Sequence, residues 1–243
     1  MFARRRTLLH FALLLAGLCA ACGSVQAATL QLEPVSIRLT PSSRAAVMRL
    51  RNGGNRPMNV QVRAFRWTQA GGEDRLHATE ALRISPPIQA ISPGAEQHVR
   101  VLLAEEFSAQ SEETFRLVVD ELPGAPAADG QVRMLIRYSV PVTVQPPGLT
   151  PPELQFQLHQ APDGAVLEAH NHGGRSARLA DLKLTTASGE TIEINRGLFG
   201  YVLAGQTRRW PLAPRTGKRF GQATGVTAQV DGKAGSFPFE VAR

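Results

Sequence analysis

The residues that could perform chemistry in this sequence are few and scattered. The triplet His170-Asn171-His172 has the ligand types of a metal site, but no third ligand follows at a usable spacing. Gly173-Gly174 comes directly afterwards, so the triplet predicts a structural hairpin turn. Four acids lie too close along one predicted strand to act as a glycosidase pair: Glu112, Glu113, Asp120 and Glu121.

Motifs for nucleophilic or nucleotide chemistry are also absent from the sequence. It contains no Gly-x-Ser-x-Gly, no phosphate-binding loop and no dinucleotide fingerprint. The glycine that follows Pro93 predicts a turn and not a phosphate cradle. We therefore expect a protein that is not an enzyme and that needs neither a metal nor a cofactor.

The first 27 residues have the form of a secretory signal peptide. Arg4, Arg5 and Arg6 form its positive end, residues 8–18 are apolar, and Val25-Gln26-Ala27 offers a cleavage site. Cleavage would leave 216 of the 243 residues, and the loss of three arginines would lower the formal charge from +7 to +4. Because the apolar segment is too short to cross a bilayer, we expect a periplasmic protein without membrane insertion.

Charge and cysteine content narrow the class of the exported chain further. The remaining positive charge comes from scattered arginines and not from a basic run interleaved with aromatic residues, which excludes a nucleic-acid surface. Both cysteines, Cys19 and Cys22, belong to the signal peptide, so the exported chain has no disulfides. Its shape must therefore depend on core burial or on binding.

Short runs of alternating apolar residues, separated by turn-forming residues, dominate the exported chain and predict an all-β fold. The first half contains seven such runs: residues 29–39, 45–51, 60–67, 82–91, 97–103, 114–122 and 131–144. Pro86-Pro87 interrupts the fourth run, which is therefore expected to be an irregular edge or a loop. Seven short strands with regular turns are typical of an immunoglobulin-like sandwich.

A proline-rich segment, residues 146–152, separates this half from a second series of β-runs and predicts a stiff hinge. The second series comprises residues 154–159, 165–170, 177–185, 191–195, 207–212, 226–230 and 236–241. We predict two immunoglobulin-like β-sandwich domains, residues 28–145 and 153–243.

The last run of the first domain, residues 131–144, would span about 45 Å, more than twice the usual strand. Val132, Met134 and Ile136 lie on its apolar parity, meaning that their side chains point to one face. One domain cannot pair so long a strand along its whole length. Part of it should lie at an edge and offer apolar side chains to a partner, and the alternative is a bent strand that is ordinary core.

Several motifs, taken together, resemble one known family, and they span the chain from Ala28 to Val241. They include Pro86-Pro87-Ile88, Glu113-Thr114-Phe115-Arg116-Leu117, Tyr138-Ser139-Val140-Pro141-Val142 and Gly200-Tyr201-Val202-Leu203-Ala204-Gly205. These motifs resemble the periplasmic pilus-assembly chaperones of the chaperone–usher pathway, in particular its archaic branch.

The resemblance implies two immunoglobulin-like domains in an L, pilus subunits as partners, and delivery of those subunits to an outer-membrane usher. It also implies that the long strand lends its edge to an incomplete subunit, with Val132, Met134 and Ile136 as donor residues. Self-association through the exposed strand is a further expectation. An immunoglobulin-like structural subunit of a surface fibre is the alternative, against which stand the complete seventh strand, the second domain and the lack of cysteines.

In this family, basic residues of the interdomain cleft hold the subunit's C-terminal carboxylate, a task that suits the planar N–H fork of arginine. The basic positions of the best-known branch fall here on residues that carry no charge. The resemblance therefore implies another anchor, for which Arg116 is the first candidate and Arg137 the second, followed by Arg38 and Arg100. Arg100 could instead pair with Glu112 or Glu113.

Overall fold

The computed structural model describes residues 30–105, 111–124, 134–161, 164–212 and 220–242. Within these ranges every regular element is a β-strand, apart from one turn of 3-10 helix at Phe220–Gln222. The strands show the period-2 burial that the sequence pattern predicts; in β12 (Gly164–Asn171) every second residue is buried. In the part of the chain that is described, no helix is long and apolar enough to span a membrane.

Strands of the first half form two sheets that enclose one core. The first sheet has the order β1-β3-β8-β6, and the second has the order β2-β10-β9-β4-β5, with β7 beside β4. Their bounds are β1 Leu30–Glu33, β2 Ile37–Leu39, β3 Ala45–Asn52, β4 Met58–Ala70, β5 Glu73–Ala78, β6 Leu82–Ser85, β7 Ile88–Ile91, β8 Glu96–Leu103, β9 Glu113–Leu122 and β10 Arg137–Val144. Met48, Phe115 and Leu117 are fully buried between the sheets. Each such side chain stabilises the sandwich by about 1.5–3 kcal/mol.

Two of the predicted runs divide between the sheets at prolines. Pro34 separates β1 from β2, and Pro86-Pro87 separates β6 from β7, so each run contributes one strand to each sheet. Proline has no backbone N–H, and the hydrogen-bond ladder breaks where it stands. The sequence analysis missed β5 because all six of its residues are exposed and no apolar alternation marks it.

The second half repeats this architecture with two sheets around a separate core. Their orders are β16-β12-β11-β19 and β14-β13-β17-β18, with β15 beside β13. The remaining bounds are β11 Leu154–Ala161, β13 Ala177–Thr186, β14 Thr191–Glu193, β15 Leu198–Val202, β16 Thr207–Leu212, β17 Ala223–Val230, β18 Lys233–Phe237 and β19 Phe239–Ala242. Phe156, Leu158 and Leu167 lie at the centre of this core. The prediction of two β-sandwiches is confirmed.

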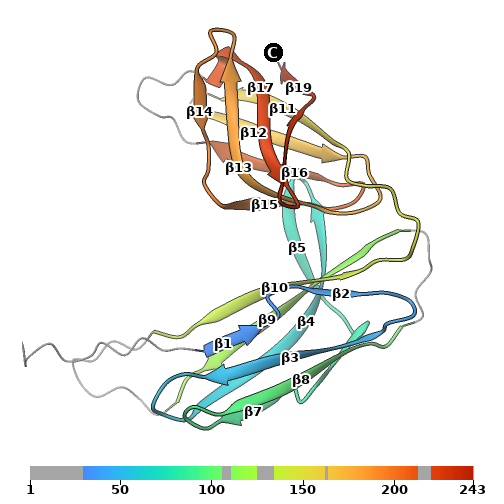
Figure 1. Cartoon of the computed structure of the whole chain (residues 1–243), viewed down its shortest axis with the longest axis vertical. Helices are drawn as coiled ribbons and strands as arrows, with labels where there is room; N and C mark the ends of the chain where they lie inside the picture. The colour runs from blue at the N-terminus through green and yellow to red at the C-terminus, as the bar shows by residue number, and fades with distance from the viewer. Residues whose placement is uncertain (1–29, 106–110, 125–133, 162–163, 213–219, 243) are drawn as a thin grey trace, which may run out of the picture.

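The two sandwiches, called the first and second lobe below, form an L (Figure 1). The β4–β5 hairpin extends from the first lobe to β15 and β16 of the second, as Figure 1 shows in teal. The segment between β10 and β11 has no strand structure and is held by the second lobe, where Gly174 N donates to Thr150 Oγ1 at 2.8 Å. A Cβ on Gly173 would lie 2.1 Å from the carbonyl oxygen of Pro151. The domain boundaries on either side of this segment stay predictions.

The last strand of the first lobe differs from its prediction. β10 begins at Arg137, residues 134–136 have no regular secondary structure, and Val132 lies outside the described residues. β10 pairs with β9 along the whole length of β10, whereas only the last three residues of β10 pair with β2. Residues 134–136 have a neighbour on one side at most, which explains why the strand is shorter than the apolar pattern predicted.

Candidate functional site

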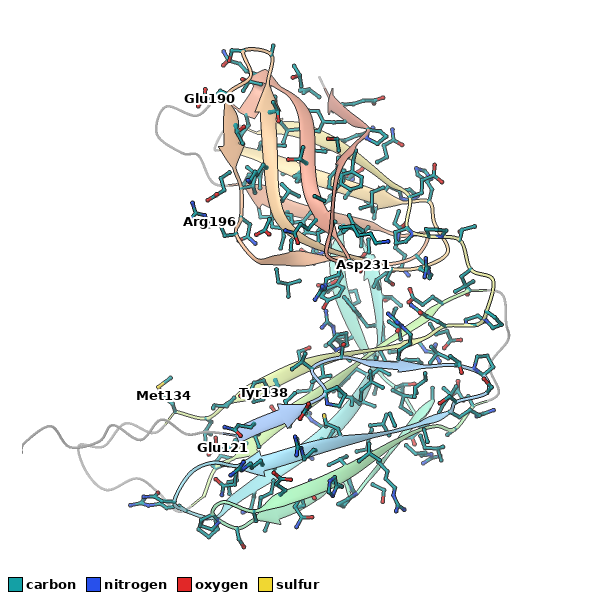
Figure 2. The ribbon with its side chains drawn as sticks, viewed as in Figure 1. Glu121, Met134, Tyr138, Glu190, Arg196 and Asp231 are labelled. Atoms are coloured by element: carbon teal, nitrogen blue, oxygen red, sulfur yellow. The ribbon has the colours of Figure 1, made fainter. Side chains whose placement is uncertain are left out.

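The corner of the L contains a cleft of 1310 Å³ lined by residues of both lobes. It lies beside β2, β9 and β10 of the first lobe and β15, β16 and β18 of the second. Its charged lining residues are Arg38, Arg116, Arg175, Arg178, Arg208, Lys233, Asp74, Glu112 and Asp231. Asp231 is visible at the second-lobe edge of the gap in Figure 2. The excess of cations over acids favours an anionic ligand.

Arg116 reaches the cleft from β9, where it lies opposite Pro141 of β10. Its guanidinium carbon is 3.7 Å from the centroid of the Trp67 ring and 5.0 Å from that of Tyr201. No carboxylate of the described ranges lies within 4.0 Å of it. Burial lowers the pKa of Arg116, but an arginine keeps its charge in proteins. The structure therefore places a half-buried cation, packed on aromatic rings, in the wall of a cleft.

The β4–β5 hairpin supplies both the ring under Arg116 and the contact between the lobes. Trp67 is 2% exposed, and its indole N–H donates to Asp74 Oδ1 at 3.0 Å. The side-chain amide of Gln69 donates to the carbonyl of Tyr201 at 2.8 Å and accepts from the N–H of Leu203 at 3.0 Å. Since Gln69 is buried, these bonds hold the two lobes together without competition from water.

A second contact between the lobes is made by Glu112, which is also buried. Its carboxylate accepts from Gln145 Nε2 at 2.7 Å and from the backbone N–H of Ser176. Glu113 forms an ion pair with Arg66. The alternative of an ion pair between Arg100 and one of these acids is wrong, because Arg100 lies on β8 of the first sheet, whereas both acids lie at the start of β9 in the second.

Arg137 lies outside the cleft, at the end of β10 that is farther from the linker. It forms an ion pair with Asp120, which also binds Arg63 Nη2 at 2.7 Å. Burial alone would raise the pKa of Asp120, but the bonds to Arg137 and Arg63 lower it below its usual value. The structure thus does not bring the two predicted anchor arginines together.

Comparison with known proteins decides the family. Residues 29–150 match the family described as "Pili and flagellar-assembly chaperone, PapD N-terminal domain". The chain belongs to this chaperone family. YhcA of Escherichia coli K12, an uncharacterized fimbrial chaperone, is 27% identical over 129 residues, which are 52% of this chain and 58% of the length of YhcA.

Solved structures of pilus chaperones share the fold of this chaperone. A chain of the CsuC-CsuE chaperone–tip adhesion subunit pre-assembly complex, from the archaic chaperone-usher Csu pili of Acinetobacter baumannii, has a TM-score of 0.70 and 23% identity. That match covers 89% of the present chain and all of the other. The complex of the Salmonella enterica SafA pilin with the SafB chaperone gives a TM-score of 0.59 at 13% identity, over 88% and 95% of the two chains. At these identities the likeness is one of fold.

Two of the predicted donor residues, Met134 and Ile136, belong to the described chain and lie at the end of the chaperone's first lobe that is away from the linker. Met134 is 77% exposed and points away from the ribbon (Figure 2), and Ile136 is half-buried. Tyr138 packs against the core and donates to the carbonyl of Leu30 at 2.7 Å. On this parity, burial therefore decreases from the core toward Met134.

The histidine triplet of the chaperone lies at a turn, but the predicted hairpin is wrong, because β12 before the turn and β13 after it belong to different sheets. Asn171 is fully buried, and its side-chain oxygen accepts from the N–H groups of Gly173 at 3.0 Å and Glu153 at 3.1 Å. The rings of His170 and His172 lie 4.2 Å apart, and burial together with this neighbour lowers the pKa of His170. Among the described ranges no three side chains of ligand type come close enough to hold a metal ion.

Sequence reasoning missed the role of the β4–β5 hairpin and of its residues Trp67, Gln69 and Asp74. A signal for it was present, because Gly71-Gly72 follows an alternating run and glycine pairs favour tight hairpins. Both glycines have positive φ values, 64° and 81°. The two tryptophans of the chaperone, Trp67 and Trp210, both line the cleft.

Proposed function

We propose that this protein is a periplasmic, non-enzymatic chaperone that binds pilus subunits by donor-strand complementation and delivers them to an outer-membrane usher. Residues 1–27 would be the signal peptide, residues 28–145 and 153–243 the two domains, and residues 146–152 the hinge. Family membership supports the class of function. The observation that carries the proposal is an open strand edge that leads to a cleft with a half-buried cation, which forms no ion pair within the described residues.

The open edge belongs to β10. The carbonyl of Ile136 accepts from Glu121 N of β9, so residues of its parity point their backbone groups toward β9. Gln145 N donates to the carbonyl of Leu39 on the other side, so residues of the opposite parity point toward β2. Since β2 pairs with β10 only from Val142 onward, the backbone groups of Arg137 and Ser139 face no strand of the described chain. Such an edge is a template for an added strand.

The donor side chains would complete the core of the subunit. A pilus subunit that lacks its last strand has an apolar groove. Met134 is 77% exposed and Ile136 is half-buried at the open end of β10, on the same parity, whereas Leu135, which is 44% exposed, has the opposite parity. We propose that Met134 and Ile136 enter this groove together with Val132, in line with the resemblance. Each would stabilise the complex by about 1.5–3 kcal/mol before the cost of ordering the segment.

The anchor for the subunit's C-terminus would be Arg116. A terminal carboxylate can accept two parallel N–H bonds from a guanidinium, and the half-buried Arg116 has no such partner among the described residues. With the carboxylate at the cleft and the strand along β10, the added strand would run parallel to β10. Arg137 remains the weaker candidate, because it lies outside the cleft and already has Asp120 as an acidic partner.

Co-expression with a pilus subunit of the same genome tests strand donation. Changing Met134 and Ile136 to Asp should leave the chaperone folded and reduce the amount of co-purified subunit at least about tenfold, because charges would enter an apolar groove. The matched control changes Val47 and Leu102 to Asp, two residues of the first sheet that are 52% and 45% exposed. Retention of the subunit at the wild-type level by the folded donor variant would contradict the proposal. Assembly of the purified chain into fibres would favour a structural subunit.

A further inference from the structure

Arg116 contacts aromatic rings from both lobes. Trp67 belongs to β4 of the first lobe and Tyr201 to β15 of the second. The two rings lie 5.3 Å apart in an edge-to-face arrangement with an interplanar angle of 81°. A residue of the first lobe is thus held in part by the second.

This way of holding a guanidinium leaves its donors free. A cation on a ring interacts through the aromatic face, whereas the N–H bonds of a guanidinium point outward in its own plane. An acid in place of the rings would take up N–H donors, as Asp120 accepts the Nε–H of Arg137. The aromatic contacts therefore immobilise Arg116 while keeping it ready for a planar anion.

Polar contacts hold the ring of Trp67 and the backbone of Tyr201. The indole of Trp67 is bonded to Asp74, which lies 3.7 Å from Arg208 of the second lobe. The backbone of Tyr201 is bonded to Gln69, whose amide also donates to Asp74 at 3.0 Å. The position of Arg116 is thus tied to the docking of the β4–β5 hairpin on β15 and β16.

We propose that Tyr201 is a positioning residue, which holds the Arg116 guanidinium against Trp67 so that a carboxylate is bound only when the lobes are docked. The inference rests on the proposed role of Arg116 as the anchor. Because linkage is reciprocal, a bound carboxylate strengthens the docking of the lobes to the same extent. The second lobe thereby contributes to binding through Tyr201.

A synthetic peptide of about ten residues, with alternating valine and threonine, tests the inference in two forms. One form has a free C-terminal carboxylate and the other a C-terminal amide. The ratio of their dissociation constants measures carboxylate recognition and cancels the effects of strand pairing. Since both tryptophans line the cleft, their fluorescence reports binding to the full-length protein.

We expect the wild type to prefer the carboxylate form and Arg116→Ala to abolish the preference. Tyr201→Ala and Tyr201→Leu should each reduce it about tenfold, whereas Tyr201→Phe should keep it within about twofold, because phenylalanine retains the aromatic face. Tyr201→Leu keeps apolar bulk and carries the test if Tyr201→Ala unfolds. The matched control is Phe199→Ala, which removes a ring of the same strand that stacks on Trp210.

The outcomes separate the two claims. An unchanged preference in Arg116→Ala would refute the anchor itself. A preference that depends on Arg116 but survives in folded Tyr201→Leu would refute the positioning role alone. A loss of preference in Tyr201→Phe as large as in Tyr201→Leu would show that the aromatic face does not act on Arg116.

Discussion

Arg116 and Arg137 lie on neighbouring strands of one sheet, yet their surroundings are opposite. The Arg137 side chain is 68% exposed and bonded to an acid, whereas Arg116 is packed on two rings and forms no ion pair within the described residues. The first arginine already has an acidic partner, which accepts its Nε–H. The second is open to a new anion because aromatic faces hold it without using its N–H donors. The type of partner, more than burial or charge, separates a structural arginine from one that can bind a ligand.

The largest effect that the comparison predicts is on subunit binding by Arg116→Ala. The affinity for a pilus subunit should fall by about 2–4 kcal/mol, because the variant leaves a carboxylate in the cleft without its partner. The melting temperature of the free protein should change little, since no ion pair is lost. Calorimetric titration and a thermal melt measure the two quantities. Unfolding of the free variant with normal affinity in the folded fraction would make Arg116 a structural residue.

The next effect concerns the partner of Arg137. Asp120→Asn should lower the free energy of unfolding at neutral pH by about 1–2 kcal/mol, since it weakens charged hydrogen bonds to Arg137 and Arg63. The folded pKa of Asp120 is lowered, so its contribution is present above the ordinary aspartate pKa of about 4 and is lost as the pH falls through the folded value.

Denaturant unfolding between pH 7 and pH 3 measures this dependence. Wild type and Asp120→Asn should differ at neutral pH and converge in acid, whereas Glu80→Gln, which alters an exposed ion pair with Arg83, should match the wild type throughout. A constant difference at every pH would mean that the Asp120 charge does not contribute to stability.

The smallest effect is expected for Arg137→Ala. Its guanidinium is largely exposed and Asp120 keeps Arg63, so the loss in stability should be below about 1 kcal/mol. Subunit affinity should stay at the wild-type value. A loss of affinity comparable to that of Arg116→Ala would bring Arg137 back as an anchor and remove the contrast between the two residues.

Much of the fold could be predicted from the period of the apolar residues, because half-buried strands alternate. The exposed strand β5 escaped prediction for the same reason, since all its residues face solvent. Arg116 could be selected as a cation within an apolar run, but its aromatic neighbours could not. Trp67 and Tyr201 come from strands far apart in the chain, and only the docking of the lobes brings them together. Likewise, the pairing of Arg137 with Asp120 depends on the register of β9 and β10.

The open edge of β10 ends at Pro141, next to the cleft. Pro141 lies opposite Arg116 and has the same parity as Arg137 and Ser139, whose backbone groups point away from β9. Proline has no N–H to donate to a neighbouring strand. From Val142 onward β2 occupies the edge. The register of a strand that adds along β10 is therefore fixed at its cleft end. A slip of one residue turns all its side chains to the wrong face. The apolar side chains of such a strand would face the correct side only if the number of residues between them and the chain end had the right parity, odd or even.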